Sequence, residues 1–317
     1  RASADAEAIL ITDDDCHRCS QESPWWGFDV LCNGDLVDKC VCVEPEPAPE
    51  PEPSPMPSPT PSPMPTPSPT PGCSAANFSE LNLGAEDWEV LFPHRNNQAC
   101  KQNKNADGTL IPGGFYEHAA FISAAKMFPC FLGEGTKEQR RRELAAFLAQ
   151  ISHETTGGWP TAPGGPQSWG LCWKEEVGCE LGQCAQYCAT GDPCSANGES
   201  VPCPCASGKT YHGRGPMQLS WNYNYAPAGV ALREPMGMPS LDLLAKPETI
   251  TQDPVLAFAT AMYFWMTPRD RKPSCHNAII GKWEPTEADR NAGRVPGFGV
   301  TTNVINGGVE GNIPNDY

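Results

Sequence analysis

A strict X-Pro dipeptide repeat runs from Glu44 to Pro71 and constrains this chain more than any other feature. Each proline removes a backbone donor and restricts the residue before it to extended dihedral angles, so neither helix nor sheet can form there. The repeat should adopt polyproline II, on the order of 85 Å long at about 3.1 Å per residue. We therefore predict a module over residues 1–43, a spacer over 44–72 and a large domain over 73–317.

The net charge of −16 excludes some classes of partner. Residues 1–43 carry −6, the four glutamates of the spacer carry −4, and the rest of the chain carries −6. An acidic surface repels phosphate backbones and anionic lipids, so we expect neither a nucleic-acid partner nor a membrane partner. The longest nearly apolar run, Val255 to Met266, is also too short to span a bilayer.

The chain contains 16 cysteines, and their spacing is not that of a ferredoxin. This cysteine content indicates an oxidising compartment, so we predict a secreted, extracellular protein. The sequence opens on Arg1 and shows no signal peptide, so we expect a mature or trimmed N-terminus.

The N-terminal module holds five cysteines, at positions 16, 19, 32, 40 and 42. A region this small buries little apolar surface and needs disulfide bonds to be stable. Because five is odd, either one cysteine pairs outside the module, with Cys73 as a candidate, or an upstream partner is missing. Trp25, Trp26 and Phe28 either form a stacking platform for sugar rings or make up the module's small core.

Helical signals dominate the large domain. Thr136 and Gln139 have the spacing of a capping box, and apolar residues then recur at helical intervals until Gly157-Gly158 ends the pattern before Trp159. Asp253-Pro254 begins a second helix, apolar on all sides, that ends at Met266. A weaker helix is expected from Tyr116 to Phe128. Residues 160–215 are rich in glycine, cysteine and proline and are expected to form a long loop region.

Glu154 is the first candidate for catalysis. It lies seven residues after Phe147, which is close to two helical turns, so it falls toward the apolar face of its helix. Burial raises the pKa of a carboxyl group and makes it a candidate general acid. The alternative is a buried glutamate paired with a neighbouring arginine. His153 has no second histidine four residues later, so we do not expect a metal site there.

A second pair of carboxylates, Glu175 and Glu176, follows Lys174 in the loop region. Taken alone, this pair is expected to be two solvent-exposed carboxylates in a loop. Together with Glu154, the pair provides one buried and one solvated carboxyl group. Acid/base hydrolysis of a glycosidic bond requires two carboxyl groups in such different environments. The segment from Tyr211 to Tyr225 adds amides, a hydroxyl and aromatic rings that suit a sugar polymer. Its alternative is a polar turn with buried tyrosines.

Several stretches together resemble the glycoside hydrolase family 19 chitinases, in particular the plant class I and class II catalytic domains. These stretches cover residues 145–159, 168–176, 213–229, 260–268 and 293–308, in the family's order and with similar spacing. The resemblance implies a mainly α, lysozyme-like domain of two lobes around a deep cleft, with long disulfide-bonded loops.

The resemblance also implies roles for individual residues. Glu154 matches the general acid, Glu176 matches the general base that activates water, and Ser220 matches the hydroxyl that helps hold this water. Further matches at substrate-binding positions are Thr156, Gln218, Tyr223, Asn224, Lys272 and Asn306. The family inverts the anomeric centre in a single displacement, so a water must fit between carboxyl groups roughly 6.5–9.5 Å apart.

The resemblance extends to cysteines. Cys100 and Cys172 match one disulfide of the family, and Cys205 matches one member of a second, with Cys188 or Cys194 as its partner. Zinc at Cys203 and Cys205 is the alternative. The family continues through a further helix beyond the end of this sequence, and Gly311 stands where it has a cysteine. The resemblance thus implies that either the sequence is truncated or this member of the family is shortened at its C-terminus.

We therefore expect a secreted endochitinase that hydrolyses β-1,4 linkages between N-acetylglucosamine units, with the cell wall and the vacuole among its destinations. We expect it to act as a monomer on chitin or its oligomers, without a cofactor or a metal. One alternative is a non-hydrolytic chitinase-like protein that binds chitin or organises a cell wall. Peptidoglycan hydrolysis is a third hypothesis.

Overall fold

The computed structural model describes residues 73, 76–100, 109, 111, 114–179, 184–190, 194–196, 199–269 and 272–310, and five short strands before residue 43. The spacer lies outside the described residues, and so do Trp25, Trp26 and Phe28. The predictions made for them are therefore not addressed by the structure.

The described part of the N-terminal module consists of short β-strands. Strand β3 (Asp29–Cys32) pairs in parallel with β1 (Ile9–Leu10) and antiparallel with β4 (Asp35–Asp38). Strand β2 (Cys19–Ser20) pairs antiparallel with β5 (Val41–Cys42), and this register places Cys19 opposite Cys42. The described residues of the module thus form β-ladders.

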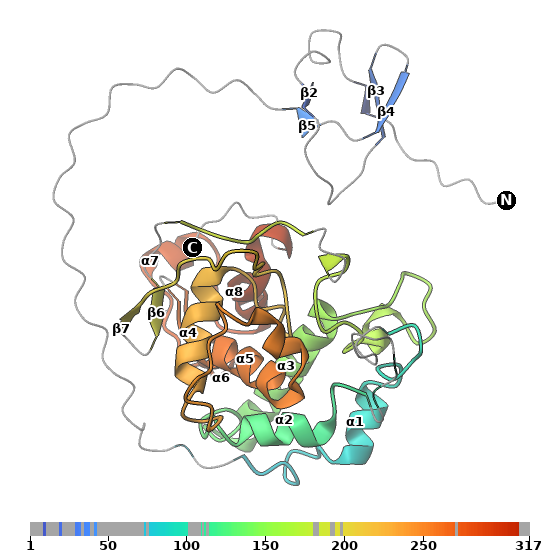
Figure 1. Cartoon of the computed structure of the whole chain (residues 1–317). Helices are drawn as coiled ribbons and strands as arrows, with labels where there is room; N and C mark the ends of the chain where they lie inside the picture. The colour runs from blue at the N-terminus through green and yellow to red at the C-terminus, as the bar shows by residue number, and fades with distance from the viewer. Residues whose placement is uncertain are drawn as a thin grey trace. The chain divides into compact units, whose positions relative to one another are not determined.

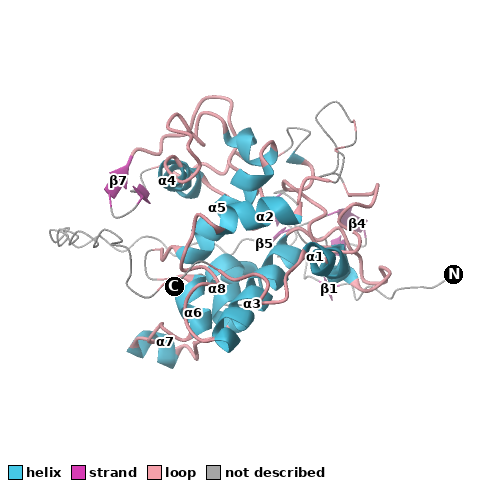
Figure 2. Cartoon of the chain, turned by 90° about the horizontal axis from the view of Figure 1, so that it is seen from below, coloured by secondary structure: helices cyan, strands magenta, loops and turns pink. Residues whose placement is uncertain are grey.

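The large domain is mainly helical, and Figures 1 and 2 show its helices joined by long loops. The helices are α1 (Ala85–Leu91), α2 (His118–Ala125), α3 (Lys137–Glu154), α4 (Asn222–Leu232), α5 (Pro254–Met266), α6 (Cys275–Ile280), α7 (Glu287–Asn291) and α8 (Phe298–Glu310). Two 3₁₀ helices, η3 (Pro166–Trp169) and η5 (Pro247–Thr251), and a hairpin of β6 (Cys194–Ala196) and β7 (Glu199–Val201) interrupt the loops. The predicted mainly α fold class is confirmed.

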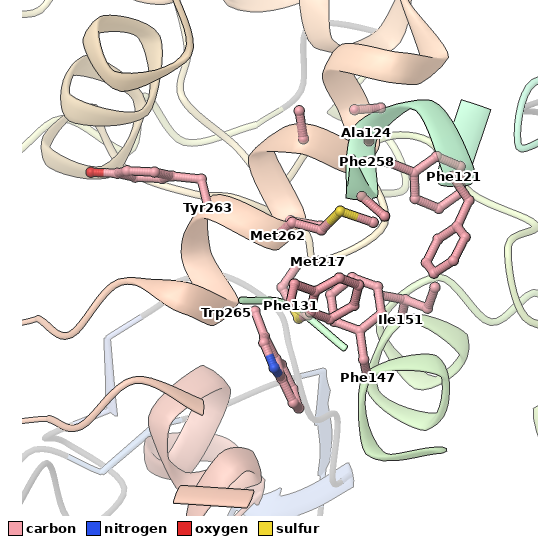
Figure 3. Close-up of a cluster of buried hydrophobic side chains, with 14 of the residues drawn as sticks. Phe121, Ala124, Phe131, Phe147, Ile151, Met217, Phe258, Met262, Tyr263 and Trp265 are labelled. Atoms are coloured by element: carbon pink, nitrogen blue, oxygen red, sulfur yellow. The ribbon is translucent and has the colours of Figure 1, made fainter. Parts of the chain in front are cut away.

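Helix α5 lies at the centre of the core, as its all-round apolar sequence predicts. Nine of its side chains are buried, and aromatic rings from α2 and α3 close around it. The Phe258 ring meets Phe121 edge-on at 5.6 Å, and Trp265 meets Phe147 at 5.3 Å. Figure 3 shows these rings gathered with Phe131 in one cluster. This packing fixes the position of α3.

Helix α3 begins as predicted and ends earlier than predicted. Thr136 and Gln139 form the capping box. The sequence pattern suggested that the helix continues up to Gly157-Gly158, but it ends at Glu154. The reason is tertiary: the carbonyl of Thr155 accepts hydrogen bonds from the amides of Cys172 and Trp173, both at 3.1 Å. The helix therefore stops at the candidate acid itself.

Disulfides hold the loops of the described domain. They join Cys73 to Cys130, Cys100 to Cys172, Cys179 to Cys184, Cys188 to Cys205, and Cys194 to Cys203. Cys73 is thus not the outside partner of an N-terminal cysteine, which corrects that expectation. The partner of Cys205 is Cys188. Because Cys203 and Cys205 are both oxidised, neither offers the thiolate that zinc would need.

None of the described helices combines the length and the apolarity that crossing a bilayer requires.

Candidate active site

The carboxyl group of Glu154 belongs to the last residue of α3. Its Oε1 is enclosed and has no hydrogen-bond partner among the described residues. Burial, followed by repulsion from the carboxylate of Glu310 on α8, raises the pKa of Glu154 to about 8. Glu154 therefore keeps its proton at neutral pH. The raised pKa argues against the alternative of a carboxylate paired with an arginine, because a neighbouring guanidinium would lower it.

The loop that follows α3 folds back onto the helix end and places the second carboxylate segment beside it. The side-chain oxygen of Thr155 accepts a hydrogen bond from the amide of Leu171 at 2.7 Å and donates one to the carbonyl of Ile151. Gly157 is needed here, because a Cβ atom would lie 2.3 Å from the Sγ atom of Cys172. Residues 171–173 are thus anchored to the residue that follows Glu154.

Two donors hold the carboxylate of Glu176. The hydroxyl of Tyr187 donates to Oε1 at 2.8 Å, and the amide of Gly213 donates to Oε2 at 3.2 Å. Its own backbone amide donates to the Gly213 carbonyl at 2.8 Å. Both carboxylate oxygens of Glu176 thus accept hydrogen bonds, in contrast with Oε1 of Glu154.

Tyr187 is a site residue that sequence reasoning missed. It lies between Cys184 and Cys188, in the region read as an irregular excursion. Burial, and then its hydrogen bond to Glu176, raise the pKa of Tyr187, so the phenol remains a donor. A tyrosine beside a cysteine in the loop that follows the candidate base was the only available signal.

The segment before α4 carries Gln218 and Ser220 in a strained turn. Gln218 and Trp221 adopt positive φ values of 48° and 74°, which cost energy for residues with a Cβ atom. The hydroxyl of Ser220 donates to the carbonyl of Gln218 at 2.9 Å, and the Gln218 amide side chain donates to Gly215 at 2.9 Å. Such outliers are common at functional sites, and here they flank the candidate water holder.

Asn224 connects this turn to the predicted binding residue Lys272. Its Nδ2 donates to the Ser220 carbonyl at 2.8 Å, and its Oδ1 accepts from the guanidinium of Arg269. Arg269 in turn forms a two-way backbone bridge with Lys272, at 3.1 and 2.8 Å. Lys272 donates to the carbonyl of Val304 at 3.3 Å, and burial lowers its pKa. Arg269 is the second residue that sequence reasoning missed.

The remaining predicted residues lie at loop and helix irregularities. Thr156 donates to the Pro166 carbonyl at 2.6 Å and accepts from the Gly158 amide at 3.1 Å, so its hydroxyl holds the loop after α3. Asn306 stands at a kink inside α8, with φ −147° and ψ 41°.

Two exposed tryptophans border these segments. Trp221 is 37% exposed and stacks on Tyr223, with ring centroids 5.8 Å apart and planes inclined by 15°. Trp159 is 47% exposed and lies 5.2 Å from Trp169. Exposed aromatic faces of this kind can stack on sugar rings.

The arrangement provides a proton donor and a proton acceptor from different segments of one domain. A protonated, enclosed carboxyl group can protonate a leaving oxygen, and an ionised, hydrogen-bonded carboxylate can activate a water molecule. Among the described residues, the groups that could hold a metal ion are built on Cys179 with Cys184 and on Cys73 with Cys130. Both pairs are disulfides, so they offer no thiolate ligand.

Comparison with known proteins shows which family model and which relatives this chain resembles. A family model described as "Chitinase class I" matches residues 83–317. Endochitinase CH25 of Brassica napus is 48% identical over 228 residues, which cover 72% of this chain and 62% of the relative. An endochitinase of Carica papaya is 48% identical over 229 residues, which cover 72% of this chain and 82% of the relative.

A third relative has a different name. The inactive chitinase-like protein 1 of Hevea brasiliensis is 50% identical over 228 residues, which cover 72% of this chain and 63% of the relative. The chain thus spans less than two thirds of the length of the Brassica and Hevea proteins.

Proposed function

Because this chain belongs to the class I chitinase family, glycoside hydrolase family 19, we propose that it is an endochitinase that hydrolyses β-1,4 linkages between N-acetylglucosamine units. The resemblance found in the sequence is thereby confirmed. The catalytic assignment rests chiefly on one observation: Glu154 is enclosed with a raised pKa, whereas both oxygens of Glu176 receive hydrogen bonds.

In the proposed mechanism, Glu154 protonates the glycosidic oxygen of the leaving sugar. Glu176 removes a proton from a water molecule on the opposite face of the ring, and the hydroxyl of Ser220 helps to hold that water. Attack by this water inverts the anomeric centre in a single displacement, without a covalent intermediate. The proton taken up by Glu176 and the proton lost by Glu154 are then exchanged with solvent.

Substrate binding is proposed for the polar residues around this pair. Gln218 lies in the turn before α4, and Tyr223 and Asn224 lie in the first turn of α4. Asn224 contacts Arg269, whose backbone pairs with that of Lys272, and Lys272 donates to α8, the helix that carries Asn306. Thr156 supports the loop after Glu154. Trp159 and Trp221 supply exposed rings for stacking. A neutral sugar polymer matches the modest charge of −6 on residues 72–317.

We propose that the protein acts as a secreted monomer of three parts, with residues 1–43 as a carbohydrate-binding module on the X-Pro spacer. Retention of the full chain on chitin beads would be compared with that of Trp25→Ala and Trp26→Ala variants. Equal retention of all three would contradict a role for these two tryptophans.

The decisive experiment follows the hydrolysis of soluble N-acetylglucosamine hexamer by the full chain, with products read by proton NMR. An inverting enzyme releases the α-anomer first, and a first-formed β-anomer would contradict the mechanism. Turnover of peptidoglycan in a parallel reaction, with none on the hexamer, would instead favour the related hydrolase hypothesis. Glu176→Gln should bind the hexamer without cleaving it.

A second candidate function is chitin binding without hydrolysis. The observation in its favour is the 50% identity to the relative named as inactive. Both Glu154 and Glu176 are present here, which favours the enzyme. Calorimetric binding of the hexamer with no products after prolonged incubation would support this second function.

A further inference from the structure

Next to the proposed base lies a buried charge cluster that the mechanism does not use. It consists of Glu175, His212 and Arg214. The side chains of His212 and Arg214 are 3% and 7% exposed, and that of Glu175 is 23% exposed. Glu175 forms an isolated antiparallel bridge with Arg214. Because side chains alternate along extended backbone, Glu175 and Glu176 point to different sides.

Arg214 is a buried cation, and its neighbour in the chain, Gly213, holds the base. Its guanidinium donates to the Thr210 carbonyl at 2.9 Å and to the Tyr225 hydroxyl at 3.0 Å. Among the described residues, Glu175 is the carboxylate within 4 Å of it, at 3.9 Å from Nε. The Thr210 carbonyl and the Tyr225 hydroxyl are neutral and leave the charge of Arg214 in place. Glu248 also interacts with this charge, and Glu175 provides the nearer compensation that a buried charge requires.

The contacts of His212 indicate that its ring is neutral. Its Nδ1 faces a guanidinium N–H of Arg214 at 3.4 Å and the Thr210 hydroxyl at 2.9 Å. A guanidinium can only donate, so Nδ1 must accept, and the ring proton lies on Nε2. Nε2 faces Glu175 Oε2 at 3.3 Å and donates to it. Glu175 therefore compensates the charge of Arg214 rather than a charge on His212.

This compensation bears directly on Glu176. The backbone of Gly213, which lies between His212 and Arg214, holds Glu176 by an amide donor and a carbonyl acceptor. An uncompensated cation beside a carboxylate lowers its pKa by about 1–3 pH units and weakens it as a base. The titratable and charged groups around Glu176 and this cluster are Lys174, Tyr116, Tyr187, His212, Arg214, Tyr225 and Glu248.

We propose that Glu175 is a positioning residue that neutralises Arg214, through direct proximity and through neutral His212, and so preserves the basicity of Glu176. This inference deepens the proposed function, since it assumes that Glu176 is the base. Glu175 itself does not touch the reacting atoms. Its role is electrostatic: it compensates the charge of Arg214, the neighbour of Gly213, which holds Glu176.

The test replaces Glu175 by glutamine, which keeps the shape and removes the charge. We expect the acid limb of the kcat/KM profile on hexamer to move about one pH unit lower, and kcat to fall about three- to tenfold. KM should change less than about twofold, because no substrate contact is lost. Glu175→Asp retains the charge and should restore most of the acid limb. The matched control is Glu80→Gln, which removes the same charge from the Glu80–Arg140 pair outside the site and should leave the profile unchanged.

A spectroscopic measurement separates this inference from the proposed function. The side-chain carboxyl of Glu176 can be titrated by carbon-13 NMR whether or not the chain cleaves chitin. A midpoint lower in Glu175→Gln than in wild type supports the proposal, and an unchanged midpoint overturns it. An inactive wild type with a shifted midpoint would refute only the catalytic assignment.

If Glu175→Gln does not fold, the protonation and tautomer of His212 in the wild type test the proposed role of Glu175. Nitrogen-15 shifts of a neutral ring with its proton on Nε2 between pH 6 and pH 8 support the proposal. An imidazolium in that range overturns it, because Glu175 would then compensate His212 instead of Arg214.

Discussion

Replacing Glu154 by glutamine should inactivate the protein and stabilise it, by an amount that grows with pH. A carboxyl group whose pKa is raised from 4.5 to about 8 binds its proton more tightly in the folded state than in the unfolded state. Between these two pH values the stability of the wild type therefore falls as pH rises. At pH 7 the cost is about 3 kcal/mol, and above pH 8 it approaches about 5 kcal/mol. Glutamine does not titrate and escapes this cost.

The measurement is urea denaturation of wild type and Glu154→Gln at pH 4, 7 and 9. We expect free energies of unfolding that differ little at pH 4 and diverge toward pH 9, with the variant more stable. Over the same range, kcat on hexamer should fall at least about 100-fold, the lower end of what general acid catalysis contributes. A constant difference in stability at all three pH values would refute the argument from burial. Near wild-type turnover would refute the role as acid.

Glu138 on the same helix provides a control of opposite sign. Its own backbone amide and the hydroxyl of Thr136 lower its pKa, so it stabilises the fold above the unfolded pKa and loses this effect as pH falls. Glu138→Gln should therefore be less stable than wild type at neutral pH, and the difference should vanish toward acidic pH.

Three further predictions follow from single contacts. Tyr187→Phe removes a donor to Glu176 and should lower kcat about tenfold while shifting the acid limb of the pH profile upward; an unchanged profile would argue against the contact. Replacing Cys100 and Cys172 together by alanine opens a loop with a sequence separation of 72 and should cost about 4 kcal/mol of stability by denaturant titration, with a loss below about 1 kcal/mol contradicting the estimate from loop entropy. Burial would lower the pKa of His276, but hydrogen bonds and charges from Glu143 and Glu134 outweigh it and raise the pKa. The stability due to His276 is thus complete below its unfolded pKa near 6.5 and is lost as pH rises through the higher folded value, so the destabilisation by His276→Gln should be larger at pH 6 than at pH 9.

The helices that build the core could be predicted from local patterns. The capping box at Thr136, the Asp253-Pro254 start of α5 and the all-round apolar character of α5 depend on residues close together in the chain. The same holds for Glu154, whose place on an apolar helix face follows from its spacing to Phe147. Burial with a raised pKa then agrees with that expectation.

The environment of Glu176 could not be predicted in this way. Its two donors come from Tyr187 and Gly213, 11 and 37 residues away, in a region that reads only as loop. The end of α3 was misplaced for the same reason, since amides from residues 172 and 173 take the Thr155 carbonyl. Contacts between loops leave no periodic pattern in the sequence, so local patterns do not predict them.

The sequence by itself thus determined the family and the mainly helical fold, and it predicted the spacer and the two carboxyl groups, because caps, periodicity and motifs are properties of neighbouring residues. Only the tertiary structure decided which carboxyl is enclosed and which is hydrogen-bonded, that Cys188 rather than Cys194 joins Cys205, and that Glu175 faces Arg214. These outcomes depend on which distant segments meet. Protonation state and basicity are set by that local environment and not by the residue type alone.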